Sequence, residues 1–194
     1  MTRIFPMLAS FSLMLMGVAM TLGLTIGDLY AQPVAAETLV WATRHRLIGV
    51  AAALFVVLVE SIGVTYFIGT SRWCKEVTET YRLPAADLAE STRLKRSAFP
   101  WLVVGMLTVV GVSALGAASD PGTGRPNTQW WTDIHFIAAL GGGCLIGWTY
   151  YRAWLKIADN QRVIERIVAQ VRQIREERGL DQPAPIEPFV ATAR

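Results

Sequence analysis

The fold of this chain is decided by residues 47–69, which read LIGVAAALFVVLVESIGVTYFIG. The stretch is apolar apart from Glu60 and three hydroxyl side chains, and it contains no proline. A helix needs about 20 such residues to cross the hydrocarbon core of a bilayer. Because lipid offers no hydrogen bonds to the backbone, a helix is the form that satisfies every peptide group internally. Residues 47–69 therefore predict a membrane-spanning helix.

Three further apolar stretches of similar length occur at residues 4–27, 100–118 and 131–151. With 53% hydrophobic and only 17% charged residues, the chain is too apolar for an ordinary soluble domain. We expect an all-α membrane protein in which four transmembrane helices form a bundle. The membrane domain would comprise residues 1–156, with a connector of helical character at 70–99.

The basic residues divide unevenly between the two sides of such a bundle. Of the 18 Lys and Arg residues, only Arg44, Arg46 and Arg125 fall on the side that carries neither terminus. Cytoplasmic loops of membrane proteins carry the excess of Lys and Arg. The pattern predicts a multi-pass inner (plasma) membrane protein with both termini in the cytoplasm. It also assigns the net charge of +3 to the lipid surface, which disfavours nucleic acid as a partner.

The first apolar stretch has two interpretations. Its basic start and the small residues Val34, Ala35 and Ala36 are compatible with a cleaved secretory signal. Residues 4–27 are longer than the usual signal core of about 7–15 residues, which favours an uncleaved helix. Either interpretation preserves the same orientation of the remaining spans.

Residues 157–179 predict a cytoplasmic amphipathic helix that continues from the fourth span. A heptad pattern places one face of it at Ile157, Asn160, Ile164, Ile167, Val171 and Ile174. This face either lies against the 70–99 connector of the same chain or mediates self-association. The helix is expected to stop at Gly179, and the Pro- and Ala-rich residues 180–194 to be a disordered tail.

The only histidines, His45 and His135, fall at the outer ends of two helices that run in the same direction. Two imidazoles at similar depth could bind one haem b from opposite faces, with Arg44 or Arg46 near its propionates. The glycines at 141–143 would then leave room for the macrocycle. The alternatives are that both histidines anchor helix ends at the head groups, and that these glycines serve close helix packing.

Glu60 is the other polar outlier, because a carboxylate near the centre of a bilayer is costly unless it is protonated, paired or hydrated. Together with Tyr66 it is a candidate for proton or ion movement, or for binding a quinone head group. The alternative is a protonated carboxyl that bonds to Ser113, Thr108 or a backbone carbonyl.

Catalytic signatures such as a nucleophile elbow, HExxH or a Walker loop do not occur in the sequence, so we do not expect an enzyme. The favoured hypothesis is a non-catalytic interaction or assembly subunit that binds a membrane-protein partner or itself. One alternative is a haem b subunit that passes electrons to or from quinone. A second alternative is a small proton or ion channel or transporter that uses Glu60.

Overall fold

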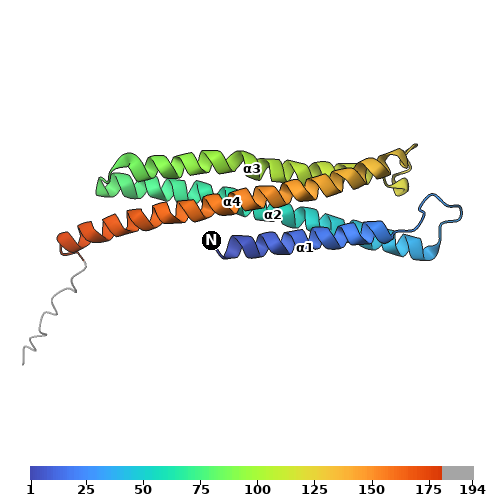
Figure 1. The fold of residues 1–194 in the computed structure, drawn as a ribbon, viewed down its shortest axis with the longest axis horizontal. Helices are drawn as coiled ribbons and strands as arrows, with labels where there is room; N and C mark the ends of the chain where they lie inside the picture. The colour runs from blue at the N-terminus through green and yellow to red at the C-terminus, as the bar shows by residue number, and fades with distance from the viewer. Residues whose placement is uncertain (181–194) are drawn as a thin grey trace, which may run out of the picture.

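The computed structural model describes residues 1–180, and these form four long helices and one short turn of 3-10 helix. The elements are α1 (Ile4–Thr25), α2 (Ala36–Tyr81), α3 (Ala85–Ala118), η1 (Pro121–Thr123) and α4 (Trp130–Glu177). The helices lie side by side along one axis and alternate in direction (Figure 1). Residues 1–180 contain no strand, so the all-α prediction is confirmed. The predicted disorder beyond Leu180 lies outside the described residues.

The bundle has two diagonally opposite helix pairs. We call the pair whose helices touch, α2 and α4, the closed diagonal, and the other pair, α1 and α3, the open diagonal. Each helix packs against the next, α4 also contacts α1, and α2 contacts α4 across the middle. The opposite diagonal pair, α1 and α3, makes at most marginal contact. Since α2 and α4 run in the same direction, residues early in α2 meet residues early in α4.

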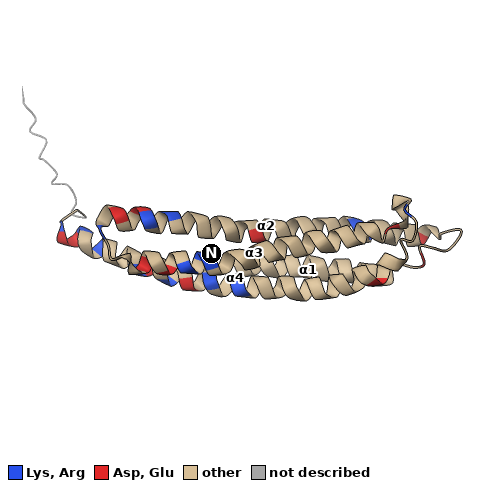
Figure 2. Cartoon of the chain, turned by 90° about the horizontal axis from the view of Figure 1, so that it is seen from above, with Lys and Arg blue, Asp and Glu red and all other residues tan. Residues whose placement is uncertain are grey.

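Three of the helices, α1, α2 and α3, are long and apolar enough to cross a membrane. The fourth predicted span lies in α4, which is not among these three. His135, the polar residues and the four glycines of that stretch lower its hydropathy. Charged residues gather toward the two ends of the bundle, chiefly at the end where α4 ends (Figure 2).

The two middle helices are longer than their apolar stretches. α2 continues without a break to Tyr81, as the lack of Gly or Pro after Gly69 predicts. Arg82, in the left-handed conformation with φ 54°, then turns the chain toward α3. The sequence favours Pro100 as the first turn of a new helix, but α3 runs through it from Ala85. Pro100 has no N–H, so it gives no helical hydrogen bond to the Arg96 carbonyl.

Small residues allow the helices to approach closely. A Cβ on Gly63 would meet a Leu102 methyl at 2.7 Å, and one on Gly142 would meet a Val112 methyl at 2.7 Å. In lipid, such contacts gain dispersion energy where hydrophobicity gives helices little reason to associate. These positions fit the interpretation of the glycines as packing residues.

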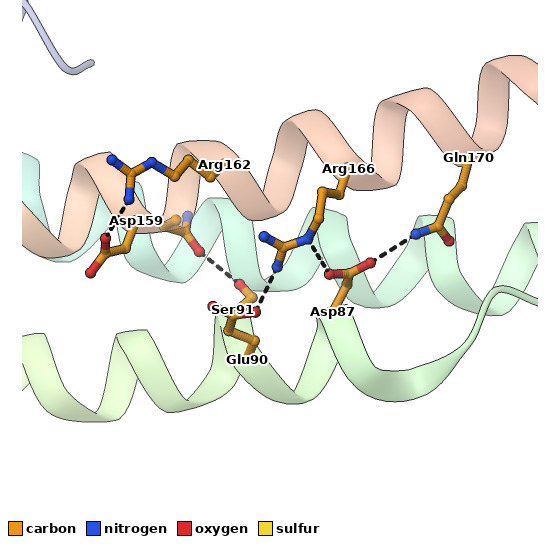
Figure 3. Close-up of polar contacts among 8 residues, drawn as sticks. Asp87, Glu90, Ser91, Asp159, Arg162, Arg166 and Gln170 are labelled. Atoms are coloured by element: carbon orange, nitrogen blue, oxygen red, sulfur yellow. Dashed lines mark hydrogen bonds and ion pairs between the residues drawn. The ribbon is translucent and has the colours of Figure 1, made fainter.

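Exposed polar contacts join the first turns of α3 to the C-terminal part of α4 (Figure 3). Arg166 of α4 lies 2.8 Å from an Asp87 carboxylate oxygen and 2.6 Å from one of Glu90. Gln170 donates a hydrogen bond of 2.9 Å to the other oxygen of Asp87. Because the Arg166 side chain is 47% exposed, these pairs fix the register of the two helices more than they stabilise them.

Beneath these contacts lies a buried polar cluster centred on Asn160, which is fully buried. The Ser91 hydroxyl donates to Asn160 Oδ1 at 3.0 Å, so it ties α3 to α4. Asn160 Nδ2 donates to Thr70 Oγ1 at 3.0 Å and to the Tyr66 hydroxyl at 3.3 Å, which adds α2. One asparagine therefore satisfies donors and acceptors from all three helices.

The predicted heptad face of α4 is covered by the same chain. Ile157, Asn160 and Ile167 are fully buried, and Ile164 and Val171 pack against the core. These contacts agree with the interpretation in which this face lies against the 70–99 connector of the same chain. Self-association would have to use another surface. α4 ends at Glu177, with Gly179 at φ 65° and the Leu180 amide donating to the Arg175 carbonyl at 3.0 Å.

Replacing Asn160 by alanine is expected to weaken the packing of α2, α3 and α4 at the end of the bundle that holds the Asn160 cluster. The substitution removes the acceptor of the buried Ser91 hydroxyl, and an unsatisfied buried group costs about 1–3 kcal/mol. The free energy of unfolding, measured by denaturant titration in detergent, should fall by that amount. Gln161→Ala is the matched control, since Gln161 bonds only to Glu165 of its own helix in an exposed contact. Equal losses in the two variants would contradict the prediction.

Candidate functional site

The two histidines, predicted to lie at similar depth, are brought together by the structure. His45 of α2 and His135 of α4 face each other across the closed diagonal, with ring centroids 6.3 Å apart and ring planes at 72°. Both rings are half-buried. Their helices are parallel and in contact, so the pair is held by the backbone of the bundle and not by a loop.

One nitrogen of His45 is engaged by α1. His45 Nδ1 lies 2.9 Å from the carbonyl oxygen of Ala19. A carbonyl can only accept, so Nδ1 carries the hydrogen, and in the neutral ring Nε2 then has a free lone pair. Histidines that bind a metal characteristically donate their second N–H to a backbone carbonyl or a carboxylate in this way.

The His135 ring is less completely satisfied by the protein. Its Nδ1 atom is buried and has no hydrogen-bond partner in the described part of the chain. Buried polar atoms without a partner are uncommon in folded proteins and mark positions where a further group can bind. His135 is therefore a candidate ligand-binding group as well as a neighbour of His45.

A glycine from a neighbouring helix lies against each imidazole. A Cβ on Gly23 of α1 would come 3.0 Å from Cε1 of His45, and a Cβ on Gly116 of α3 would come 3.0 Å from Cε1 of His135. Any larger residue would push the ring. The two half-sites thus repeat one arrangement, in which α1 serves α2 and α3 serves α4.

The separation of the rings fits two ligands of one metal ion. A metal–imidazole bond is about 2 Å long, and the ring centre lies about 1 Å behind the bonding nitrogen, so two imidazoles on opposite sides of one ion have centres about 6 Å apart. Residues 1–180 contain no group of three or more His, Cys, Asp or Glu residues that could hold a metal ion. A metal that brings its own equatorial donors, as haem iron does, is the kind that two histidines suffice to hold.

The arginines expected near this site have other contacts. Arg46 forms an ion pair with Asp120 at 2.9 Å, which ties α2 to the α3–α4 connector. Arg44 lies over the Trp41 ring, with 4.9 Å from the guanidinium carbon to the ring centroid. A cleft of about 830 Å³ opens at the same end and is lined by Tyr30 and residues from Asn127 to Asp133. Neither histidine lines this cleft.

Glu60 occupies a second polar position on the same diagonal. Its side chain is fully buried, and Oε1 lies 2.7 Å from the Thr149 hydroxyl of α4. Thr149 Oγ1 is also 2.8 Å from the Ile146 carbonyl, which can only accept. A hydroxyl has one hydrogen, so both contacts are full hydrogen bonds when Glu60 is protonated and donates to Thr149. The other carboxyl oxygen, Oε2, has no partner in the described residues.

Gly105 makes room for this carboxyl. A Cβ on Gly105 of α3 would overlap Glu60 Oε1 and come within 2.9 Å of the Thr149 hydroxyl. The predicted hydrogen bond from Glu60 to Ser113 or Thr108 is wrong. Each donates to the carbonyl four residues earlier in its own helix, at 2.8 Å and 2.7 Å. Serine and threonine commonly make this bond in helices.

Tyr66, predicted to act with Glu60, belongs to the Asn160 cluster. Its hydroxyl accepts from Asn160 Nδ2, and within residues 1–180 it forms no hydrogen bond with Glu60. The residues that sequence reasoning missed are Thr149, Gly105, Gly23 and Gly116. The glycines carry a packing signal in the sequence, but nothing there tells which polar side chain each one faces.

The chain was compared with protein-family models, with curated proteins and with solved structures, and none of the three comparisons found a match. The functional inference therefore depends on the geometry of these two polar positions.

Gly105→Ala is expected to destabilise the bundle through Glu60. The added methyl group overlaps the carboxyl, and overpacking of this kind costs about 1–3 kcal/mol. Glu60→Ala removes the obstacle, so the double variant should lose less stability than the two single changes combined. The measurement is a double-mutant cycle of unfolding free energies in detergent.

Gly111→Ala is the control for this cycle. Gly111 lies on the same helix as Gly105, but a Cβ there would meet nothing within 4 Å. It should leave stability unchanged or raise it slightly, since alanine favours helix. Additive effects of Gly105→Ala and Glu60→Ala would show that the two residues do not interact.

Proposed function

We propose that this protein is a multi-pass membrane protein that binds haem b between His45 and His135 and passes single electrons. The observation that carries the proposal is the 6.3 Å separation of the two imidazole centroids, which suits two axial ligands of one iron. The hydrogen bond of His45 Nδ1 to the Ala19 carbonyl supports it, because it leaves Nε2 as the ligating nitrogen.

The chain's own residues would hold the group as follows. His45 and His135 would hold the iron, while Gly23 and Gly116 let the two imidazole rings lie against α1 and α3. Held by two histidines, the iron would supply electron transfer and not substrate chemistry.

The proposal includes the topology expected from the sequence. The apolar part of α4 would be a fourth span, because it packs along α3 and contains His135. With both termini in the cytoplasm of an inner membrane, the histidine pair lies near the outer surface. Electrons would be exchanged there with a quinol or quinone in the lipid, or with a membrane-protein partner.

A visible absorption spectrum tests the proposal. Protein purified from cells supplied with a haem precursor should show a Soret band, and dithionite should sharpen the visible bands as expected for six-coordinate haem b. His45→Ala and His135→Ala should each remove or strongly shift these bands. Since the chain has only these two histidines, no other imidazole can replace either one. Protein without a Soret band, or a band unchanged in both variants, would overturn the assignment.

The glycines beside the histidines provide a second readout. Gly116→Ala places a methyl group 3.0 Å from Cε1 of His135. Displacing a group that orients a metal ligand typically lowers affinity about 10-fold or more, so haem should dissociate faster from this variant. Gly111→Ala, one and a half turns away with open space at its Cβ, is the control and should retain haem like the wild type.

An assembly role is the second candidate, and it is favoured by glycines on the outside of the bundle. Gly111 of α3 and Gly141 of α4 have nothing within 4 Å of an added Cβ. They lie at similar depth, because Gly142 faces Val112. Outward-facing small residues permit close packing of another membrane helix. A monomer without co-purifying protein in native mass spectrometry would contradict this role.

A further inference from the structure

A groove lies where the apolar parts of α2 and α3 end, on the side of the bundle that carries the longer helical extensions. It has a volume of about 370 Å³ and is lined by Ile68, Lys95, Arg96, Phe99 and Pro100. We call it the α2–α3 groove. The Ile68 side chain is 52% exposed and that of Phe99 41% exposed, so an apolar wall faces outward beside two cations.

The two cations of the α2–α3 groove have no anionic partner within residues 1–180. Neither Lys95 nor Arg96 forms an ion pair or side-chain hydrogen bond with any residue in the range 1–180. At this end Arg72 is paired with Glu76 at 2.8 Å and Arg166 with Asp87 at 2.8 Å, whereas Arg82 and Arg93 form no ion pair within residues 1–180. The groove therefore presents a local excess of positive charge.

The groove also stands at the depth of the lipid head groups. Ile68 is next to the last residue of the apolar stretch of α2, and Pro100 is the first residue of that of α3. Hydrocarbon thus begins on one side of the groove and charged sequence on the other.

We propose that the α2–α3 groove binds an anionic phospholipid. The lipid phosphate lies between Lys95 and Arg96, and the first part of one acyl chain lies along Ile68 and Phe99. Basic pockets between transmembrane helices on the cytoplasmic side are suited to lipids of this class. The site does not depend on the histidine pair, which lies at the other end of the bundle.

The test is lipid titration of the full-length, delipidated protein in a neutral detergent, followed by native mass spectrometry. Phosphatidylglycerol and phosphatidylcholine with identical acyl chains are the two probes. The wild type should bind the first phosphatidylglycerol more tightly than phosphatidylcholine. The double variant Lys95→Gln/Arg96→Gln should bind it about 30-fold more weakly, at roughly fivefold for each cation near the membrane surface.

Arg3→Gln/Arg93→Gln is the matched control, because it removes the same charge from exposed positions that do not line the groove. It should change the affinity less than twofold. Phe99→Ala tests the apolar wall and should weaken phosphatidylglycerol binding several-fold. Circular dichroism and the unfolding midpoint, measured on every variant, establish that each one is folded.

Three outcomes would overturn the proposal. Equal losses in the groove and control variants would mean that the lipid is attracted by the surface as a whole. Equal affinity of the wild type for the two lipids would show that the groove does not recognise the net negative charge of the head group. Competition by millimolar inorganic phosphate, together with no effect of Phe99→Ala, would assign the cations to a free anion.

Discussion

Contact between α2 and α4 across the diagonal is the constraint on which the rest of the structure depends. In lipid, helices gain little hydrophobic free energy by associating, so packing and polar contacts must hold them. Along this diagonal the polar contacts occur at three depths: His45 with His135, Glu60 with Thr149, and Tyr66 and Thr70 with Asn160. Because the two helices are parallel, neighbouring levels are separated by similar lengths of α2 and α4, as with the 15 residues from His45 to Glu60 and the 14 from His135 to Thr149.

The other two helices complete each level of this diagonal. α1 and α3 place Gly23 and Gly116 against the histidines, and α3 places Gly105 against Glu60. At the Asn160 level α3 contributes a hydroxyl, that of Ser91, in place of a glycine. The polar side chains of α2 and α4 thus fit where α1 or α3 carries a small residue, which explains why the small residues at these levels lie on those two helices.

The order and alternating direction of the helices followed from hydropathy and charge, and they were enough to place His45 and His135 at one depth. The helix lengths did not follow, because α2 begins at Ala36 and α3 runs through Pro100. The rotation of each helix about its axis did not follow, because stretches such as residues 47–69 are apolar on every face. This is why Thr149 was missed as the partner of Glu60, and why Gly23 and Gly116 were not linked to the histidines. The heptad face near Asn160 was predictable, since polar residues there mark the outer face.

The short length of α1 divides the molecule into two unlike parts. The Trp154 indole donates to the Thr2 carbonyl at 3.3 Å, so the start of α1 lies at the level of Trp154, and α2, α3 and α4 continue beyond it as three helices (Figure 1). α1 therefore contributes to the histidine level and the apolar core but not to the Asn160 cluster. Removing α1 from the bundle would uncover His45 and leave every hydrogen bond of the Asn160 cluster in place.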